Sequence, residues 1–428
     1  MDSSERAMII SSDGHAMPKM RDYRPYLTAK LQEHFDEFCE YYDKYGAPPM
    51  DPAHLRNRLD PDEVERWSKN LWETGRLDGC ADSTKRLAEM EHEGIVGEVL
   101  FPDFGLPFQG RVPTPTRKYD QAPTWPARTP EQVHEGNRAH NRWLVDYCAV
   151  APERFCAMAI VSFDDVDAAL TEIRWAREAG LKGLLLPIFS HEEPIFHPRH
   201  EPIWDLLEEL EMPANSHIAL SATAQLSTYS GIPHPAASLP LHGGEMTMRC
   251  HELLPHLIWS GLLERHPKLQ VAFTEQGSSW VIGMLTGFDY SYDGSYARQD
   301  IRELVPMRPS EYFRRQCWLG SSLFSRAEIE ARHRIGIDQM LLGMDYPHHE
   351  GTFARGTVNY LRATLGAAGV PVDEAKRLLG ENAVARWGFD ASLLRPLADR
   401  VGPELALVLT PPDEDLYPRG DVGKPLAA

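Results

Sequence analysis

The segment Met340–Gly351 places a polar cluster directly after a short apolar run, and it constrains the fold of the chain more than any other segment. Its apolar run ends in glycine, and a proline stands two positions beyond Asp345, so we expect a buried strand whose end points into a pocket. A matching segment lies near the start of the chain, where the apolar run Met8–Ile10 precedes Asp13 and His15. In a closed barrel of parallel strands the first and last strands are neighbours, so both polar clusters would lie at the same rim.

Short apolar runs alternate with amphipathic segments between these two ends. We expect further strands at Val96–Phe101, Phe155–Val161, Gly183–Ile188, Pro213–Ser216, Gln270–Phe273 and Cys317–Leu319. We expect helices at Asp82–Ile95, Glu131–Val150, Asp164–Gly180, Trp204–Leu210 and His251–Leu263. Strands that alternate with helices favour a parallel α/β architecture, and we predict a distorted (β/α)8 TIM barrel.

The length of the chain leaves room for structure outside the barrel. Its 428 residues exceed the roughly 250 typical of a (β/α)8 barrel, and we prefer one barrel with long insertions to two domains. We predict a single barrel domain over residues 1–395, with insertions at about 20–80 and 103–130, and an irregular C-terminal arm over 396–428. Helical spacing in Leu31–Tyr42 predicts that the first insertion forms a cap over the barrel mouth. A packing or dimer contact is an alternative that is compatible with a cap.

Charge and cysteine content exclude several classes of function. The formal net charge of −19 argues against a nucleic-acid partner, because phosphate binding requires concentrated Lys and Arg. The six cysteines form no Cys-x-x-Cys pair, which is typical of reduced thiols in a cytoplasmic protein. The N-terminus is not basic and no apolar stretch is long enough to cross a bilayer, so we expect neither a signal peptide nor a membrane partner. We expect a small-molecule substrate, and the insertion and the C-terminal arm favour a homodimer.

Five side chains that can bind metal follow the expected strands. Asp13 and His15 follow the first strand, His217 the fifth, Glu275 the sixth and Asp345 the last. Catalytic groups of (β/α)8 enzymes gather at the carboxyl ends of the strands, so residues far apart in the sequence would converge there. Each residue alone is often structural, but two imidazoles and three carboxylates in barrel order predict a site for one or two divalent transition-metal ions. Zinc, iron and manganese all suit this mixture of ligands.

The order of these residues resembles that of a known family. An Asp-x-His after the first strand, a histidine after a middle strand and an Asp-Tyr-Pro-His turn after the last strand are similar to the amidohydrolase-related (amidohydrolase 2) branch of the amidohydrolase superfamily. The resemblance extends from about Ile9 to about Asp390 and includes the segments His256–Trp280 and Leu379–Asp390. It implies a metal-dependent (β/α)8 enzyme, because this family contains metal-dependent hydrolases and decarboxylases.

Two departures from the family pattern bear on the chemistry. Decarboxylases of the family typically carry a histidine at the end of strand six, where it acts as an acid or a base, and this chain has Glu275 there. Glu275 could orient a ligand histidine or bind the metal directly. The fourth strand ends in Pro187–Phe189 without a lysine, so we expect the carboxylated-lysine bridge of many two-metal amidohydrolases to be absent.

The reaction we expect is metal-assisted hydrolysis of an amide, ester, thioester or lactone. A bound cation would lower the pKa of a water molecule, and Asp345 would take the proton from that water and deliver it to the leaving group. His348 could hold the developing oxyanion, bind a second metal ion or donate only a supporting hydrogen bond. We expect Trp280 and His242 to line the substrate pocket, and His349 and Glu350 are weaker site candidates.

Two alternatives to hydrolysis stay open on the sequence alone. The first is metal-dependent nonoxidative decarboxylation of an unsaturated or aromatic carboxylic acid, which the family resemblance permits. Glu275 in place of the family's histidine favours hydrolysis over this alternative. The second is a non-catalytic binding or scaffold protein, which the five ligand-competent rim positions disfavour.

Overall fold

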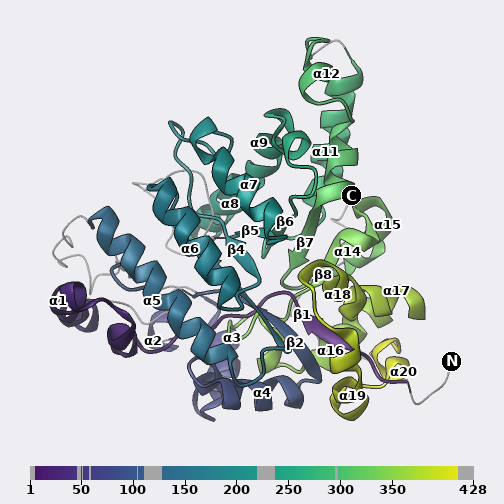
Figure 1. Cartoon of the computed structure of the whole chain (residues 1–428). Helices are drawn as coiled ribbons and strands as arrows, with labels where there is room; N and C mark the ends of the chain where they lie inside the picture. The colour runs from purple at the N-terminus through teal and green to yellow at the C-terminus, as the bar shows by residue number, and fades with distance from the viewer. Residues whose placement is uncertain are drawn as a thin grey trace.

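Eight parallel strands form the centre of the computed structural model, which describes residues 5–45, 50, 52–56, 59–103, 105–109, 128–218, 237–294 and 297–412. The strands are β1 (Ile9–Ser11), β2 (Ile95–Leu100), β3 (Phe155–Ile160), β4 (Gly183–Leu185), β5 (Ala214–His217), β6 (Val271–Thr274), β7 (Cys317–Ser321) and β8 (Met340–Leu342). They are hydrogen-bonded in the order in which they occur along the chain, and each pairs in parallel with the next (Figure 1).

The two ends of the sheet meet at the carboxyl ends of β1 and β8. The backbone N–H of Ser12 donates to the carbonyl of Leu342 at 2.6 Å. Directly beyond this bond, the N–H of Asp345 donates to the carbonyl of Asp13 at 2.9 Å. The two polar clusters are therefore held side by side at one rim, and the prediction of a TIM-like (β/α)8 barrel is confirmed.

Helices surround the strands (Figure 1). The longer ones are α4 (Ser83–His92), α5 (Pro130–Cys148), α6 (Val166–Glu178), α7 (Glu201–Glu209), α8 (Ser238–His251), α9 (Leu253–Trp259), α11 (Trp280–Asp293), α13 (Pro309–Gln316) and α18 (Asn382–Trp387). Shorter helical segments are η4 (Pro198–His200), α10 (Leu262–Arg265), α12 (Ile301–Leu304), α14 (Arg326–Glu330), α15 (Arg332–Ile335), η6 (Ile337–Gln339), η7 (Thr352–Ala354), α16 (Thr357–Leu361), η8 (Arg362–Gly366), α17 (Val372–Lys376) and η9 (Arg377–Glu381). The helix expected at His251–Leu263 is divided among the end of α8, α9 and the start of α10.

Local sequence explains where the helix before β2 begins and ends. The carboxylate of Asp82 accepts hydrogen bonds from the backbone N–H groups of Thr84 and Lys85, so it caps the free donors of the first turn of α4. The chain leaves this helix through Gly94, whose φ of 77° is a left-handed conformation that glycine adopts without a steric penalty. The short connection directs the chain straight into β2, one of the strands that carries the rim.

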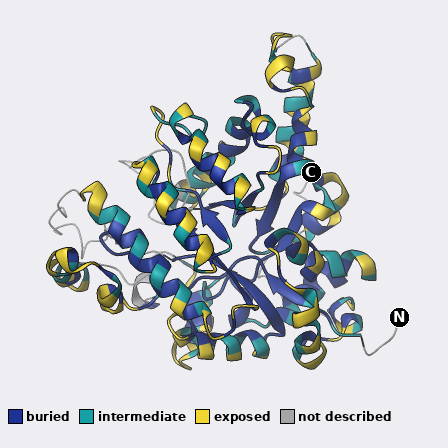
Figure 2. Ribbon diagram, viewed as in Figure 1, coloured by how far each residue is buried: buried dark blue, intermediate teal, exposed yellow. Residues whose placement is uncertain are grey.

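Apolar side chains fill the barrel below the rim. The strands contribute buried residues to one interior cluster, among them Ile10, Val99, Met158, Leu185, Trp318 and Leu341. The ring of Trp318 meets that of Trp387 edge-on, with centroids 5.6 Å apart. Figure 2 shows the strands as a dark blue, buried centre surrounded by helices whose outer faces are exposed. Because the interior is a packed core, the polar groups at the strand ends face the rim.

The first insertion is helical, as predicted. It contains η1 (Met20–Tyr26), α1 (Ala29–Tyr45), α2 (Pro52–Leu55), α3 (Pro61–Trp67), η2 (Ser68–Trp72) and η3 (Arg76–Cys80). The indole N–H of Trp67 donates to the carbonyl of Pro347 at 2.8 Å, and the side-chain amide of Asn70 donates to the carbonyl of Ala354 at 2.8 Å. The insertion thus packs against the loop after β8, which carries Asp345.

The chain beyond residue 395 is more regular than the irregular arm that we predicted. Helices α19 (Ala391–Val401) and α20 (Leu405–Val408) occupy the part of this segment that the structure describes, and residues 413–428 lie outside it. The carboxylate of Asp390 caps α19 by accepting from the N–H of Ser392 at 2.8 Å, and Leu394 is buried on the inner side of the helix. Pro396 lies inside α19 and weakens its helical pattern in the sequence.

Two further predictions, the second insertion and the absence of a membrane-spanning helix, can be compared only with the described residues. Most of the second insertion, predicted over residues 103–130, lies outside the described residues, which resume at Arg128. Among the helices of the described ranges, none combines the length and the apolar character that a membrane span requires.

A buried histidine joins the first insertion to α5 and predicts a pH dependence of stability. Nδ1 of His140 lies 2.8 Å from the hydroxyl of Tyr23, and burial lowers the pKa of His140 to about 3. The unfolded chain binds a proton at this side chain near its ordinary pKa, and the folded protein does not. The free energy of unfolding should therefore fall as the pH decreases from about 6.5 towards 3, by up to about 1.4 kcal/mol per pH unit.

Urea unfolding at pH 7 and pH 5 measures this effect as a difference between variants. In His140→Gln, which keeps a polar partner for Tyr23, the decrease in stability between the two pH values should be smaller than in the wild type. His92→Gln, at a histidine whose side chain is 69% exposed, serves as the control and should follow the wild type. An equal decrease in His140→Gln and the wild type would contradict the prediction.

Candidate metal centre

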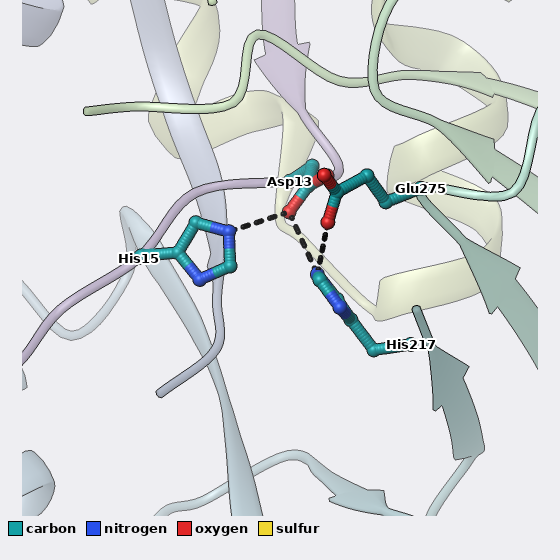
Figure 3. Close-up of side chains that lie close together, drawn as sticks. All are labelled: Asp13, His15, His217 and Glu275. Carbon is teal, nitrogen blue, oxygen red and sulfur yellow. Dashed lines mark hydrogen bonds and ion pairs between the residues drawn. The ribbon is translucent and has the colours of Figure 1, made fainter. Parts of the chain in front are cut away.

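The structure brings together four of the five predicted metal-ligand residues in one compact group. Asp13 and His15 follow β1, His217 ends β5 and Glu275 follows β6. One ligand atom of each lies within 4.8 Å of the ligand atoms of the others, and the side chains converge from three directions (Figure 3). Nε2 of His217 is 3.3 Å from Oδ1 of Asp13 and 3.5 Å from Oε2 of Glu275, and Nε2 of His15 is 3.7 Å from Oδ1 of Asp13.

Asp345, the fifth predicted ligand, lies at the edge of this group. Its side chain is fully buried, and its Oδ1 is 3.3 Å from Nε2 of His15. Within the described part of the chain neither of its carboxylate oxygens accepts a hydrogen bond of normal geometry. Nδ1 of His348 lies 2.7 Å from the same Oδ1, so the buried carboxylate lies between two imidazoles, an environment that also suits a metal ligand.

The backbone fixes which nitrogen of each histidine faces the group. Nδ1 of His15 lies 2.9 Å from the carbonyl oxygen of Pro102, and Nδ1 of His217 lies 2.9 Å from the carbonyl oxygen of Ile218. A carbonyl only accepts, so each Nδ1 carries a proton and each Nε2 is directed at the carboxylates, through an N–H or, with a metal ion bound, through its lone pair. A lone pair that faces a carboxylate is repelled unless a cation lies between them, and this is how proteins orient histidine ligands of metals.

Unusual backbone conformations place two of the carboxylates. Glu275 and Asp345 have φ values of 57° and 54°, in the left-handed region, which costs a non-glycine residue about 1–2 kcal/mol. The closure of the barrel also needs a glycine, because a Cβ at Gly343 would lie 2.7 Å from Cβ of Asp13. Strain of this kind persists where the surrounding structure enforces it, and it is common at functional sites.

Carboxylates of this group strongly influence one another's protonation. Burial raises the pKa of Glu275 well above its usual value, and the nearby charges of Asp345 and Asp13 raise it further. Burial also raises the pKa of Asp13, but the hydrogen bond and charge of His217 outweigh it, so the pKa of Asp13 is below its usual value. The crowding of negative charge favours a bound cation at this place.

His348 connects this group to a residue that the sequence interpretation missed. Nδ1 of His348 lies 2.7 Å from Oδ1 of Asp345, and its Nε2 lies 3.7 Å from Oδ1 of Asp103. Burial lowers the pKa of His348, but the charges of Asp345 and Asp103 raise it well above its usual value. Asp103 follows β2, so the rule that selected the other strand-end residues applies to it as well.

The two weaker candidates of the same loop lie beside this group. Glu350 lies near Glu275, Asp345 and His348, and His349 pairs with Glu350 at 2.5 Å.

A buried arginine links β2 to the segment that follows β1. Arg86 of α4 pairs with the buried Glu98 at 2.8 Å and donates to the carbonyl of His15 at 3.1 Å. Its guanidinium also lies 3.6 Å from the centre of the ring of Tyr346, the residue after Asp345. On the other side, the hydroxyl of Ser322 donates to Oδ2 of Asp13. Nothing in the sequence pattern distinguished these two supporting residues.

Of the two residues predicted to line the substrate pocket, the structure describes the side chain of Trp280 and not that of His242. Trp280 begins α11, and its ring stacks on His251 with centroids 3.9 Å apart. This packing accounts for its position, and its role in substrate binding stays a prediction. His242 belongs to α8, but its side chain lies outside the part of the structure that is described.

A TIM-like barrel with buried carboxylates and imidazoles at its carboxyl rim defines the class of metal-dependent barrel enzymes. The family model described as Amidohydrolase matches residues 95–389, and the chain belongs to this family. The resemblance seen in the sequence is therefore confirmed.

Relatives within the family that are similar in sequence are decarboxylases of aromatic acids. The chain is 27% identical over 219 residues to gamma-resorcylate decarboxylase of Rhizobium sp. (strain MTP-10005), a match that covers 49% of this chain and 65% of the relative. It is 26% identical over 267 residues to gamma-resorcylate decarboxylase of Rhodococcus jostii, a match that covers 59% of this chain and 76% of that relative. The chain thus spans just under two thirds of the first of these relatives.

Solved structures extend the likeness of the fold to nearly the whole chain. The 5-carboxyvanillate decarboxylase of Sphingomonas paucimobilis has a TM-score of 0.61 at 18% identity, covering 90% of this chain and 100% of that one. The 5-carboxyvanillate decarboxylase of Novosphingobium aromaticivorans, solved with bound manganese and a nitrobenzoic acid, has a TM-score of 0.60 at 17% identity, covering 89% and 97%. At such identities these structures establish the fold alone.

Proposed function

We propose that this chain is a metal-dependent, nonoxidative decarboxylase of aromatic carboxylic acids. The observation that carries the proposal is the compact group of Asp13, His15, His217 and Glu275, with Asp345 at its edge 3.3 Å from His15, in which Nε2 of both imidazoles faces buried carboxylates. The comparisons support the decarboxylase alternative better than the hydrolase that we preferred from the sequence, because the similar proteins named above are decarboxylases.

The residues of the group fit a divalent transition-metal ion. Two neutral imidazoles and anionic oxygens suit manganese, iron or zinc, and manganese is supported by its presence in related decarboxylase structures. Asp13, His15, His217 and Asp345 would hold one ion. Glu275 would bind the same ion or accept a hydrogen bond from substrate, as its Oε2 lies 3.5 Å from Nε2 of His217.

The reaction requires one proton at the carbon that loses carbon dioxide. When bound, the cation supplies positive charge that holds the substrate carboxylate and stabilises negative charge on the ring. The bond between the ring carbon and the carboxyl carbon breaks, its electron pair stays on the ring carbon, and a proton forms the new C–H bond. Asp345 and His348, 2.7 Å apart, would supply that proton, with His348 recharged from solvent.

Hydrolysis of an amide, ester, thioester or lactone is the second candidate, and Glu275 favours it. A carboxylate at the end of β6 could act as the base that removes a proton from water. Burial and the carboxylates of Asp345 and Asp13 raise the pKa of Glu275, but a cation bound beside it would lower that pKa again. The preference for decarboxylation therefore comes from the similar proteins, which are decarboxylases.

A substrate panel distinguishes the two reactions. The purified chain, loaded with Mn²⁺, is incubated with 2,6-dihydroxybenzoate and 5-carboxyvanillate, and in parallel with aryl ester, thioester, amide and lactone substrates. We expect release of one carbon dioxide per aromatic product from at least one acid, and no hydrolysis above the rate of the metal-free protein. Hydrolysis of a carbonyl substrate without release of carbon dioxide from either acid would overturn the proposal in favour of the second candidate.

A further inference from the structure

A cavity of about 310 Å³ opens beside the candidate metal centre, at the carboxyl ends of β2, β3 and β4. Apolar side chains form much of its wall, including Leu106, Ile160, Val161, Leu186 and Pro187. This volume is at the lower end of the range found for small-molecule sites and accommodates one substituted benzene ring. The apolar wall suits the faces of such a ring.

Two residues that contact the metal centre form one side of this cavity. Pro102, whose carbonyl oxygen orients His15, and Asp103, whose Oδ1 lies 3.7 Å from Nε2 of His348, both line it. A ring whose reacting carboxylate is held at the metal centre can therefore extend into the cavity. The charge of Asp103 is directed towards His348, which reduces its repulsion of an acidic ligand.

Arg128 supplies the positive charge of the cavity wall. Among the described residues, no carboxylate forms an ion pair with Arg128, although the chain as a whole carries a net charge of −19. Arg128 is exposed, and the neighbouring groups that partly bury its guanidinium lower its pKa. An anion in the cavity would accept charge-assisted hydrogen bonds from this guanidinium. The amide of Gln109 donates to the side chain of Asn137 at 2.7 Å and adds a polar edge to the same wall.

The backbone at Arg128 is fixed by the start of α5. The hydroxyl of Thr129 accepts from the N–H of Gln132 at 3.2 Å, and the side chain of Gln132 accepts from the N–H of Thr129 at 3.0 Å. This reciprocal capping box, with Pro130 at the first helical position, anchors the residue that follows Arg128. The backbone next to Arg128 is therefore fixed beside the cavity that its side chain lines.

We propose that Arg128 binds a second anionic substituent of the substrate, so that this chain acts on aromatic acids that carry two anionic groups. One carboxylate is lost as carbon dioxide at the metal centre, and the other group is retained in the cavity against Arg128. The inference rests on the proposed decarboxylase function for the reaction, but the binding site itself can be tested without turnover.

Calorimetric binding to the Mn²⁺-loaded protein tests the site directly, with benzene-1,3-dicarboxylate and benzoate as probes. We expect the wild type to bind the dicarboxylate about 10- to 100-fold more tightly than benzoate, the usual gain from a hydrogen bond to a charged group. Arg128→Met should remove this preference, and Arg128→Lys should restore part of it. Arg298→Met, at an arginine whose side chain is 87% exposed, is the matched control and should keep the wild-type preference. Equal preference in Arg128→Met and the wild type would overturn the inference.

Turnover separates a failure of this inference from a failure of the proposed function. For 5-carboxyvanillate, Arg128→Met should raise KM about 10- to 100-fold with a smaller change in kcat, and for 2,6-dihydroxybenzoate KM should change less than about threefold. Equal effects on both acids would overturn the inference and leave the decarboxylase intact. If the wild type decarboxylates neither acid but still binds the dicarboxylate through Arg128, the proposed function fails and the anion site stands.

Discussion

Replacing Asp345 with asparagine is expected to lower kcat for decarboxylation by about 10²- to 10⁴-fold, the range over which positioned acids and bases contribute. Asparagine has nearly the same shape, so the buried side chain still fits. It cannot carry a proton between solvent and substrate, and it cannot compensate the positive charge of His348, whose Nδ1 lies 2.7 Å away. Steady-state rates of carbon dioxide release from the best substrate of the panel measure the effect.

The metal content of Asp345→Asn determines which role is lost. Retained metal with a low kcat assigns Asp345 mainly to proton transfer, and loss of metal assigns it mainly to ligation. Asp338→Asn, at an aspartate whose side chain is 62% exposed and paired with Arg377, is the control and should keep wild-type activity. A kcat for Asp345→Asn within threefold of the wild type would contradict both roles.

Removing the metal, or one imidazole that would bind it, should abolish activity. After dialysis against a chelator the wild type should release no carbon dioxide above background, and Mn²⁺ should restore the rate. In His217→Ala the affinity for Mn²⁺ should fall by at least about 100-fold, beyond the 10- to 100-fold that loss of a supporting hydrogen-bond partner costs. Metal titration followed by activity and by thermal unfolding measures both effects, because a ligand that binds only the folded state raises its stability.

A matched histidine makes the metal experiment specific. His92→Ala removes a 69% exposed side chain at the end of α4, and this variant should titrate with Mn²⁺ as the wild type does. Full activity of the chelated wild type would contradict a metal-dependent reaction. Equal Mn²⁺ affinity in His217→Ala and His92→Ala would exclude His217 as a ligand.

The rim residues could be predicted because strand ends in a closed barrel share one edge. Asp13 and Asp345 stand 332 positions apart along the chain, yet the alternation of strands and helices placed both at the same rim. The structure joins them by a hydrogen bond from the N–H of Asp345 to the carbonyl of Asp13. The same rule applied to Pro102–Asp103 would have added Asp103 beside His348, because that residue also follows a strand.

Other features depend on long-range contacts that no local pattern encodes. Arg86 lies in the middle of α4, where a charged residue is usually exposed to solvent. The structure instead buries it against Glu98 and the ring of Tyr346. The left-handed conformation of Glu275 is likewise imposed by its surroundings. The helical C-terminal segment was missed for a related reason, because the backbone N–H of Leu405 in α20 donates to the carbonyl of Glu5, a residue about 400 positions earlier.

The choice between hydrolysis and decarboxylation could not be made from the rim residues. Both reactions use a divalent cation held by imidazoles and carboxylates, and Glu275 can serve either as a base or as an acid. Burial and the carboxylates of Asp13 and Asp345 raise the pKa of Glu275, and a bound cation would lower it, so its protonation does not separate the two reactions. Those neighbours come from β1 and β8, so their effect becomes visible only in the folded chain.

The measurement that tests the central claim most directly is the position of manganese in crystals of the Mn²⁺-loaded protein, located by anomalous diffraction. We predict one strong peak at about 2.0–2.3 Å from Nε2 of both His15 and His217, with oxygens of Asp13 and Asp345 completing its protein ligands. A peak elsewhere, or no peak among these four side chains at saturating Mn²⁺, would contradict the account.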